Sequence, residues 1–158
     1  MADYIQQSVG AFELPMNTPA PLITSVPDTT GRLSHREGSG TITLAGCRDR
    51  VPRCKCCNCC NNNMGAKYLI SFNGNIAVPT GGTAGEIAIA FTIDGETEYT
   101  TISKATPAAV ENYFSVSASK NIILPRGCCC ENVAVENVSS TNQNILVDNL
   151  NVTITPVN

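Results

Sequence analysis

Apolar and polar residues alternate strictly over residues 86–94, and this alternation constrains the fold more than any other feature of the sequence. Ile87, Ile89, Phe91 and Ile93 occupy every second position there. A period of two places successive side chains on opposite faces of an extended chain. The segment therefore predicts a β-strand with one face buried.

The same period recurs from residue 38 to the end of the chain. Strands are predicted at residues 40–44, 67–78, 86–94, 98–102, 112–118, 121–124, 132–137 and 144–154. Asp94-Gly95 predicts a hairpin turn, because both residues tolerate positive φ. No convincing helix of about ten residues is present, which excludes the crossover helices of a parallel α/β fold. We expect an all-β fold, with one jelly-roll or β-sandwich domain behind an extended N-terminal arm.

Residues 1–38 show no sustained periodicity. Four prolines, the first of them Pro15 and the last Pro27, remove backbone donors and disfavour both a helix and a central strand. Apolar residues are present all the same, and those expected to bind a partner are Tyr4, Ile5, Phe12 and Leu14. An arm that docks on a capsid or other structural protein is one interpretation, and an arm folded against its own domain is the other. The predicted division is an arm at 1–38 and a jelly-roll-like domain at 39–158.

The composition provides little for catalysis or for binding to nucleic acid. The net charge is −3 and only 15% of the residues are charged, so the chain as a whole has no charge that would attract it to nucleic acid or anionic lipid. His35 is the single histidine, and no carboxylate pair has a spacing that suggests acid–base catalysis. No secretory signal is visible, and no apolar run approaches the ~20 residues of a membrane-spanning helix. We expect a protein that is not an enzyme and has no membrane partner.

Nine cysteines form two clusters in predicted loops: Cys47, Cys54, Cys56, Cys57, Cys59 and Cys60, and then Cys128, Cys129 and Cys130. Thiolates bind zinc and other soft metals, although three contiguous cysteines converge poorly on one ion. Disulfides within or between chains are the second interpretation, and the odd number leaves one thiol to pair across an interface. The third interpretation is that the thiols are free and buried. It explains few of the cysteines, because most of them lie in a polar loop. The residues alone leave metal, disulfide and free thiol open, and no cofactor is certain.

Three segments resemble the small trimeric jelly rolls of the C1q/TNF-like kind: Ser71–Pro79 (SFNGNIAVP), Gly85–Gly95 (GEIAIAFTIDG) and Asn144–Ile154 (NILVDNLNVTI). Such domains occur at the tips of collagen-like spore-surface glycoproteins and in phage fibre and capsid-decoration proteins. Residues 33–158, including His35–Gly40 (HREGSG), also resemble small cysteine-bearing proteins encoded by prophages of gut Firmicutes. The resemblance implies a trimeric jelly roll in a virion.

The expected function is that of a structural virion protein, a trimeric capsid-decoration or head-fibre subunit assembled in the host cytoplasm. The small residues Ala88, Ala90 and Thr92, on the outward side of their strand, are expected to permit close contact between subunits. One alternative is a spore-surface or appendage subunit crosslinked through its cysteines. A carbohydrate-binding jelly-roll module is another, although the chain has no tryptophan and only four tyrosines to form a sugar platform.

Overall fold

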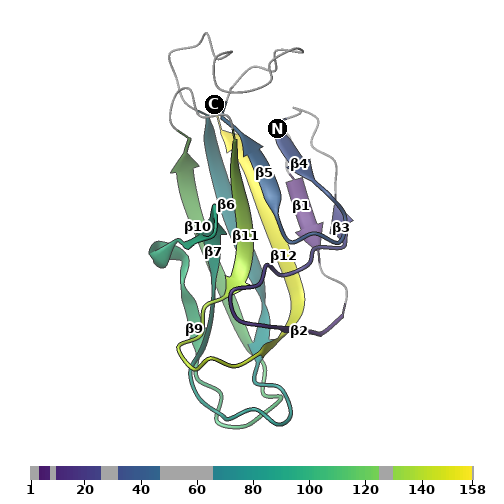
Figure 1. The fold of residues 1–158 in the computed structure, drawn as a ribbon, viewed down its shortest axis with the longest axis vertical. Helices are drawn as coiled ribbons and strands as arrows, with labels where there is room; N and C mark the ends of the chain where they lie inside the picture. Colours follow the sequence, from purple (N-terminus) through teal and green to yellow (C-terminus); the bar gives the residue numbers. More distant parts are fainter. Residues whose placement is uncertain (1–3, 8–9, 26–31, 47–65, 125–129, 158) are drawn as a thin grey trace.

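The computed structural model describes residues 4–7, 10–25, 32–46, 66–124 and 130–157, and these form two antiparallel sheets packed as a sandwich (Figure 1). The order of strands in sheet A is β10 (Phe114–Ile123), β6 (Lys67–Ala77), β12 (Ile145–Val157), β1 (Tyr4–Gln7) and β3 (Thr24–Ser25), with β2 (Phe12–Leu14) also on β12. In sheet B the order is β4 (Leu33–His35), β5 (Ile42–Ala45), β11 (Cys130–Asn137), β7 (Ile87–Ile93) and β8 (Glu96–Thr97), with β9 (Ser103–Ala105) also on β7. The predicted all-β sandwich is confirmed.

The core lies between the sheets and is built from alternate residues of the long strands. On β6 the side chains of Tyr68, Ile70 and Phe72 are buried, whereas the residues between them reach solvent. Phe72 meets Phe91 of β7 edge to face, with ring centroids 5.0 Å apart, so this pair joins the two sheets directly.

The hairpin predicted at Asp94-Gly95 is confirmed. Both residues have positive φ, 51° and 84°, and Ile93 pairs with Glu96 on either side of the turn. The strand expected at 98–102 is wrong, because a 3₁₀ helix, η1 (Tyr99–Thr101), separates β8 from β9. The strand is interrupted because a side chain takes the place of a backbone acceptor. The Oγ1 of Thr101 accepts the hydrogen bond that the Phe91 amide donates, at 3.0 Å. The strands expected at 112–118 and 121–124 form one strand, β10, with continuous pairing to β6.

The small side chains of β7 do not form an exposed surface, which corrects the expected subunit contact. Ala88, Ala90 and Thr92 are 2%, 0% and 2% exposed. Cross-strand neighbours lie on the same face of a sheet; Ala88 pairs with Lys104, and Ala90 with Glu136. The longer neighbours cover the shorter side chains within a single copy of the chain.

The N-terminal residues complete both sheets, so position 38/39 is not a boundary between an arm and a separate domain. Strands β1 and β2 pair with β12, and Met16 and Pro19 form single bridges to β11. Pro19 has no N–H to donate, and the neighbouring Ala20 amide donates to the Val135 carbonyl at 2.8 Å instead. Three apolar residues of this segment are 1% exposed: Leu14, Ala20 and Leu22. Of the two interpretations left open, the structure has the segment folded against its own domain.

A fully buried side-chain amide ties this segment to the β11–β12 connection. Asn137 Nδ2 donates to the carbonyl oxygens of Leu14 at 3.0 Å and Gln143 at 2.9 Å. Its Oδ1 accepts hydrogen bonds from the Ser139 amide at 3.0 Å and the Ser139 hydroxyl at 2.7 Å. One side chain therefore makes four hydrogen bonds that join the N-terminal segment to the β11–β12 connection.

Candidate functional site

The outer face of sheet A is the most distinctive surface of the described residues. The side chains that point outward from β6, β10 and β12 alternate with core residues, and most are short, polar and uncharged. They are Ser71, Asn73, Asn75, Ser115, Ser117, Ser119, Asn121, Asn149, Asn151, Thr153 and Thr155. Lys67 and Asp148 are the charged residues among the outward positions described on these three strands.

A β-bulge in β12 shapes this face. The pairing of β12 with β6 shifts between Asp148 and Asn151, and Asn149 has a positive φ of 51°. Leu150 is fully buried beside Gly74, where an added Cβ would lie only 3.3 Å from the Leu150 Cα. Gly74 thus provides the space in which Leu150 enters the core. The extra residue leaves Asp148, Asn149 and Asn151 all reaching solvent.

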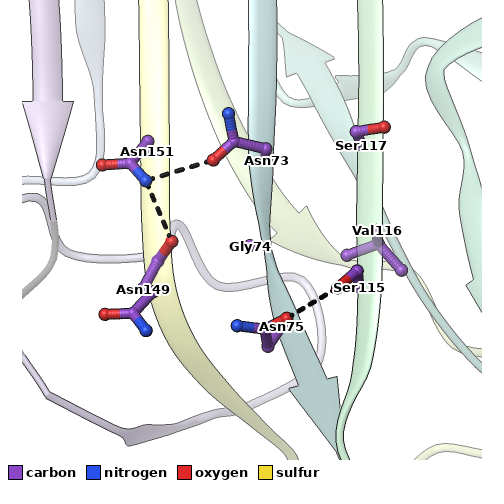
Figure 2. A pocket seen from close by; sticks show the side chains of 8 residues that line it. All are labelled: Asn73, Gly74, Asn75, Ser115, Val116, Ser117, Asn149 and Asn151. Atoms are coloured by element: carbon purple, nitrogen blue, oxygen red, sulfur yellow. Dashed lines mark hydrogen bonds between the residues drawn. The ribbon is translucent and has the colours of Figure 1, made fainter.

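A hollow of about 370 Å³, here called the polar hollow, lies over the bulge (Figure 2). Its lining is Asn73, Gly74, Asn75, Ser115, Val116, Ser117, Asn149 and Asn151. Asn151 Nδ2 donates to Asn73 Oδ1 at 3.1 Å and to the Asn149 carbonyl at 3.2 Å. On the other side of the hollow, the Ser115 hydroxyl donates to Asn75 Oδ1 at 3.0 Å. These bonds hold amide and hydroxyl groups in place around the opening.

Tyr113 and Asp148 flank the polar hollow. Tyr113 precedes Ser115 by two positions, and its side chain is 40% exposed. Asp148 pairs with Asn75 in the sheet register. Burial, and then the negative charges of Asp148 and Glu111, raise the pKa of the Tyr113 phenol, so this hydroxyl stays protonated at neutral pH.

The opposite end of the same face carries three exposed apolar residues around Lys67. Ile123 and Val157 both pair with Lys67, and Leu69 lies two residues farther along β6, diagonal to both. Leu69, Ile123 and Val157, here called the apolar cluster, are 39%, 64% and 38% exposed. Exposed apolar side chains that adjoin one another mark interaction surfaces more often than isolated ones do.

The outer face of sheet B differs in charge. A hollow of about 320 Å³ there is lined by Pro19, Thr41, Thr92, Asp94, Gly95, Asn132, Ala134 and Glu136. Glu136 is 8% exposed, and this burial raises the pKa of its carboxyl group. Burial, and then the charge of Asp94, raise the pKa of Glu131 nearby. The carboxyl groups of Asp94 and Glu136 therefore line this hollow.

The pKa of Glu136 predicts a specific dependence of stability on pH. A buried carboxyl with a raised pKa binds its proton more tightly in the folded state than in the unfolded state. The stability that it contributes is present at low pH and is lost as pH rises from the ordinary value of 4.5 through the folded pKa. We expect Glu136→Gln to raise the melting temperature at pH 7.5 and to change it little at pH 4, as measured by thermal unfolding.

Glu98 provides the matched control of opposite sign. A hydrogen bond from Lys120, with 2.5 Å between Nζ and Oε1, is the main cause of the lowered pKa of Glu98. Its contribution is present above pH 4.5 and is lost as pH falls through the folded pKa. Glu98→Gln should therefore lower the melting temperature slightly at pH 7.5, since partly exposed pairs contribute about 0–1 kcal/mol. The same response of both variants at pH 7.5 would contradict this account.

Most of the predicted site residues lie apart from this face. Of the nine cysteines, all but Cys130 lie outside the described residues; Cys130 is exposed at the start of β11, where it pairs with Ala45. Leu14 is inside the core and Phe12 is partly buried against it, while Tyr4 and Ile5 lie on β1, and binding of this segment to a partner stays a prediction. The sequence reasoning did not predict a site on the outer face of sheet A. Asn or Ser at every second position in 73–75, 115–119 and 149–151 was the pattern that could have indicated it.

Comparison with solved structures identifies the class of fold. The globular domain of a zebrafish complement 1qA protein aligns over 100% of this chain and 98% of its own, with a TM-score of 0.60 and 8% identity. The Eiger TNF of S. frugiperda aligns over 100% and 92%, with a TM-score of 0.65 and 10% identity. Murine APRIL aligns over 97% and 98%, with a TM-score of 0.54 and 8% identity. The fold is thus a jelly roll similar to those of the C1q/TNF-like kind, as the resemblance implied.

The sequence matches no protein-family model and no curated protein. At these low identities the structural likeness establishes the fold and leaves function to be argued from the surface. Among the described residues, no helix has the length and apolar character needed to cross a membrane.

Proposed function

We propose that the protein is a non-enzymatic structural subunit of a virion, a homotrimer of the capsid-decoration or head-fibre type. The observation that carries the proposal is the apolar cluster at the end of the otherwise polar, nearly uncharged face of sheet A. Removing such side chains from water favours association in proportion to the area covered. The C1q/TNF-like fold supports a trimer, and the resemblance of residues 33–158 to prophage proteins supports the virion.

Charge favours sheet A over sheet B as the surface between copies. Two copies that met through sheet B would bring together the carboxyl groups of Asp94 and Glu136, in a chain whose net charge is already −3. Like charges at close range oppose association. On sheet A, Lys67 lies between Ile123 and Val157, and Asp148 pairs with Asn75 at the polar hollow, so the apolar end can meet a copy without facing a carboxylate cluster.

Docking on a capsid protein is part of the same proposal. Within the N-terminal segment it rests on β1, because Leu14 and Leu22 are needed by the core. Because β1 pairs with β12 at all four of its residues and with β3 at Gln6 and Gln7, a partner strand adds on the side of β3, the last strand of sheet A there.

The test of self-association is Ile123→Asp. Ile123 is 64% exposed, so the substitution should not disturb the core, while it places a charge in the apolar cluster. We expect the wild-type protein to be a trimer at micromolar concentration and the variant to be largely monomeric, because the new carboxylate replaces apolar surface and must lose its hydration in the contact, even with Lys67 across the sheet from it. Analytical ultracentrifugation or light scattering measures the difference.

Tyr99→Asp is the matched control. Tyr99 is 80% exposed on η1, away from the apolar cluster, so its substitution adds the same charge to another exposed apolar position. The control should remain a trimer. A wild-type chain that is monomeric at micromolar concentration, or an Ile123→Asp variant that stays trimeric, would overturn the proposal.

A further inference from the structure

Self-association through the apolar cluster does not require the polar hollow. Asn75 is six residues from Leu69 on β6, which corresponds to roughly 20 Å along an extended strand. A contact centred on the apolar cluster therefore leaves the hollow at the far end of the face. The volume of the hollow, about 370 Å³, falls within the range of roughly 300–1,000 Å³ that is usual for small-molecule sites.

The chemistry of the lining selects neutral ligands rich in hydroxyl groups. Apart from Gly74 and Val116, every lining residue is an asparagine or a serine. Amides and hydroxyls offer both donors and acceptors, and a sugar hydroxyl needs one of each from its site. No lining residue is ionisable, so the hollow offers nothing to offset the charge of a phosphate or an acidic sugar.

The flanking residues add two features to this lining. Tyr113, which is 40% exposed, lies two residues before the lining residue Ser115, and Asp148, whose carboxylate is a strong acceptor, pairs with the lining residue Asn75. An aromatic ring has an apolar body and a polar tip, which suits a sugar with its C–H and hydroxyl groups. Although the chain lacks tryptophan, Tyr113 is thus an exposed aromatic residue within two positions of the lining.

The site is also held open before any ligand arrives. The bulge fixes Asn149 at positive φ, and Leu150 anchors it by packing on Gly74. Asn151 is bonded to Asn73, and Ser115 to Asn75, so these side chains point into the opening in Figure 2 rather than sampling many rotamers. Ordering before binding reduces the entropic cost of binding.

We infer that the polar hollow binds a short neutral saccharide, one or two sugar rings long, between Tyr113 and the asparagines of β6 and β12. The hydroxyl groups of the sugar bond to Asn73, Asn75 and Asn149, and one face of a ring lies against Tyr113. Because the opening is shallow, we expect weak binding, with Kd on the order of 1 mM for a single site.

The experiment is saturation-transfer NMR with the full-length protein and a fixed panel: galactose, N-acetylglucosamine, maltose, lactose and, as the charged member, sialyllactose. At least one neutral sugar should bind with a measurable Kd, and sialyllactose should bind no better than lactose. Asn73→Ala and Tyr113→Ala should each weaken the binding by roughly tenfold or more. Matched controls are Ser119→Ala on the same face outside the hollow and Tyr99→Ala on η1, which should leave Kd unchanged.

Two further measurements separate this inference from the proposed function. Sugar binding should persist in Ile123→Asp, and Asn73→Ala should keep the oligomeric state of the wild type, with its fold confirmed by circular dichroism. If Asn73→Ala unfolds, Asn73→Ser replaces it. The inference is overturned if no neutral sugar in the panel binds, if Tyr99→Ala weakens binding as much as Tyr113→Ala does, or if the Asn73 variant dissociates the trimer, which would make the hollow a subunit contact.

Discussion

Removal of residues 1–25 is expected to leave a chain without a cooperative thermal unfolding transition. The deletion takes away β1, β2 and β3 together with Leu14 and Leu22, which are 1% exposed. Burying one such leucine contributes about 1.5–3 kcal/mol, whereas the whole domain is stable by only about 5–15 kcal/mol. Circular dichroism as a function of temperature tests this result. A truncated chain that melts cooperatively at the wild-type temperature would restore the interpretation of these residues as a dispensable arm.

A pair of neighbouring residues tests the same point without a deletion. Leu22→Ala should destabilise the protein by roughly 2–5 kcal/mol, because the cavity lies in a packed core. Ile23→Ala should stay within about 0.5 kcal/mol, since Ile23 is 49% exposed. Equal effects of the two substitutions in chemical denaturation would mean that Leu22 is not in the core.

After the removal of residues 1–25 and Leu22→Ala, Asn137→Ala is expected to lower the free energy of unfolding the most. It leaves the carbonyls of Leu14 and Gln143 and the backbone amide of Ser139 without their hydrogen-bond partner in a buried site. Each unsatisfied buried group costs about 1–3 kcal/mol, partly offset by relaxation, so a loss of roughly 2–4 kcal/mol is expected. That loss should lower the melting temperature by roughly 5–15 °C in a chain of this size.

Asn144→Ala is the control for this prediction. Asn144 also joins the β11–β12 connection to the N-terminal segment, through a 3.3 Å bond from its Nδ2 to Glu13 Oε2, but that bond is exposed to water. Water replaces an exposed partner, so the change in stability should be within about 0.5 kcal/mol. Comparable losses in the two variants would mean that burial is not what makes Asn137 important.

The sequence by itself determined the strands and the class of fold, because the alternation of apolar and polar residues can be recognised within each segment alone. A residue on a half-buried strand alternates with its neighbours whatever the partner strand is, so β6, β7, β11 and β12 could be predicted from their own residues. The turn at Asp94-Gly95 was equally local, since positive φ depends on those two residues.

Only the tertiary structure decided which surfaces are buried and where the candidate sites lie. The prolines at 15–21 argued against a strand in this segment. Its bridges to residues 136 and 137 could not be predicted, because those residues are distant in the sequence. Ala88 and Ala90 alternate as solvent-facing residues do, yet their cross-strand neighbours cover them. The polar hollow brings Asn73, Ser115 and Asn149 together from three strands by register and by a bulge. Alternation shows which side chains leave water, whereas register and strand order decide which of them meet, and those depend on contacts between residues distant in sequence.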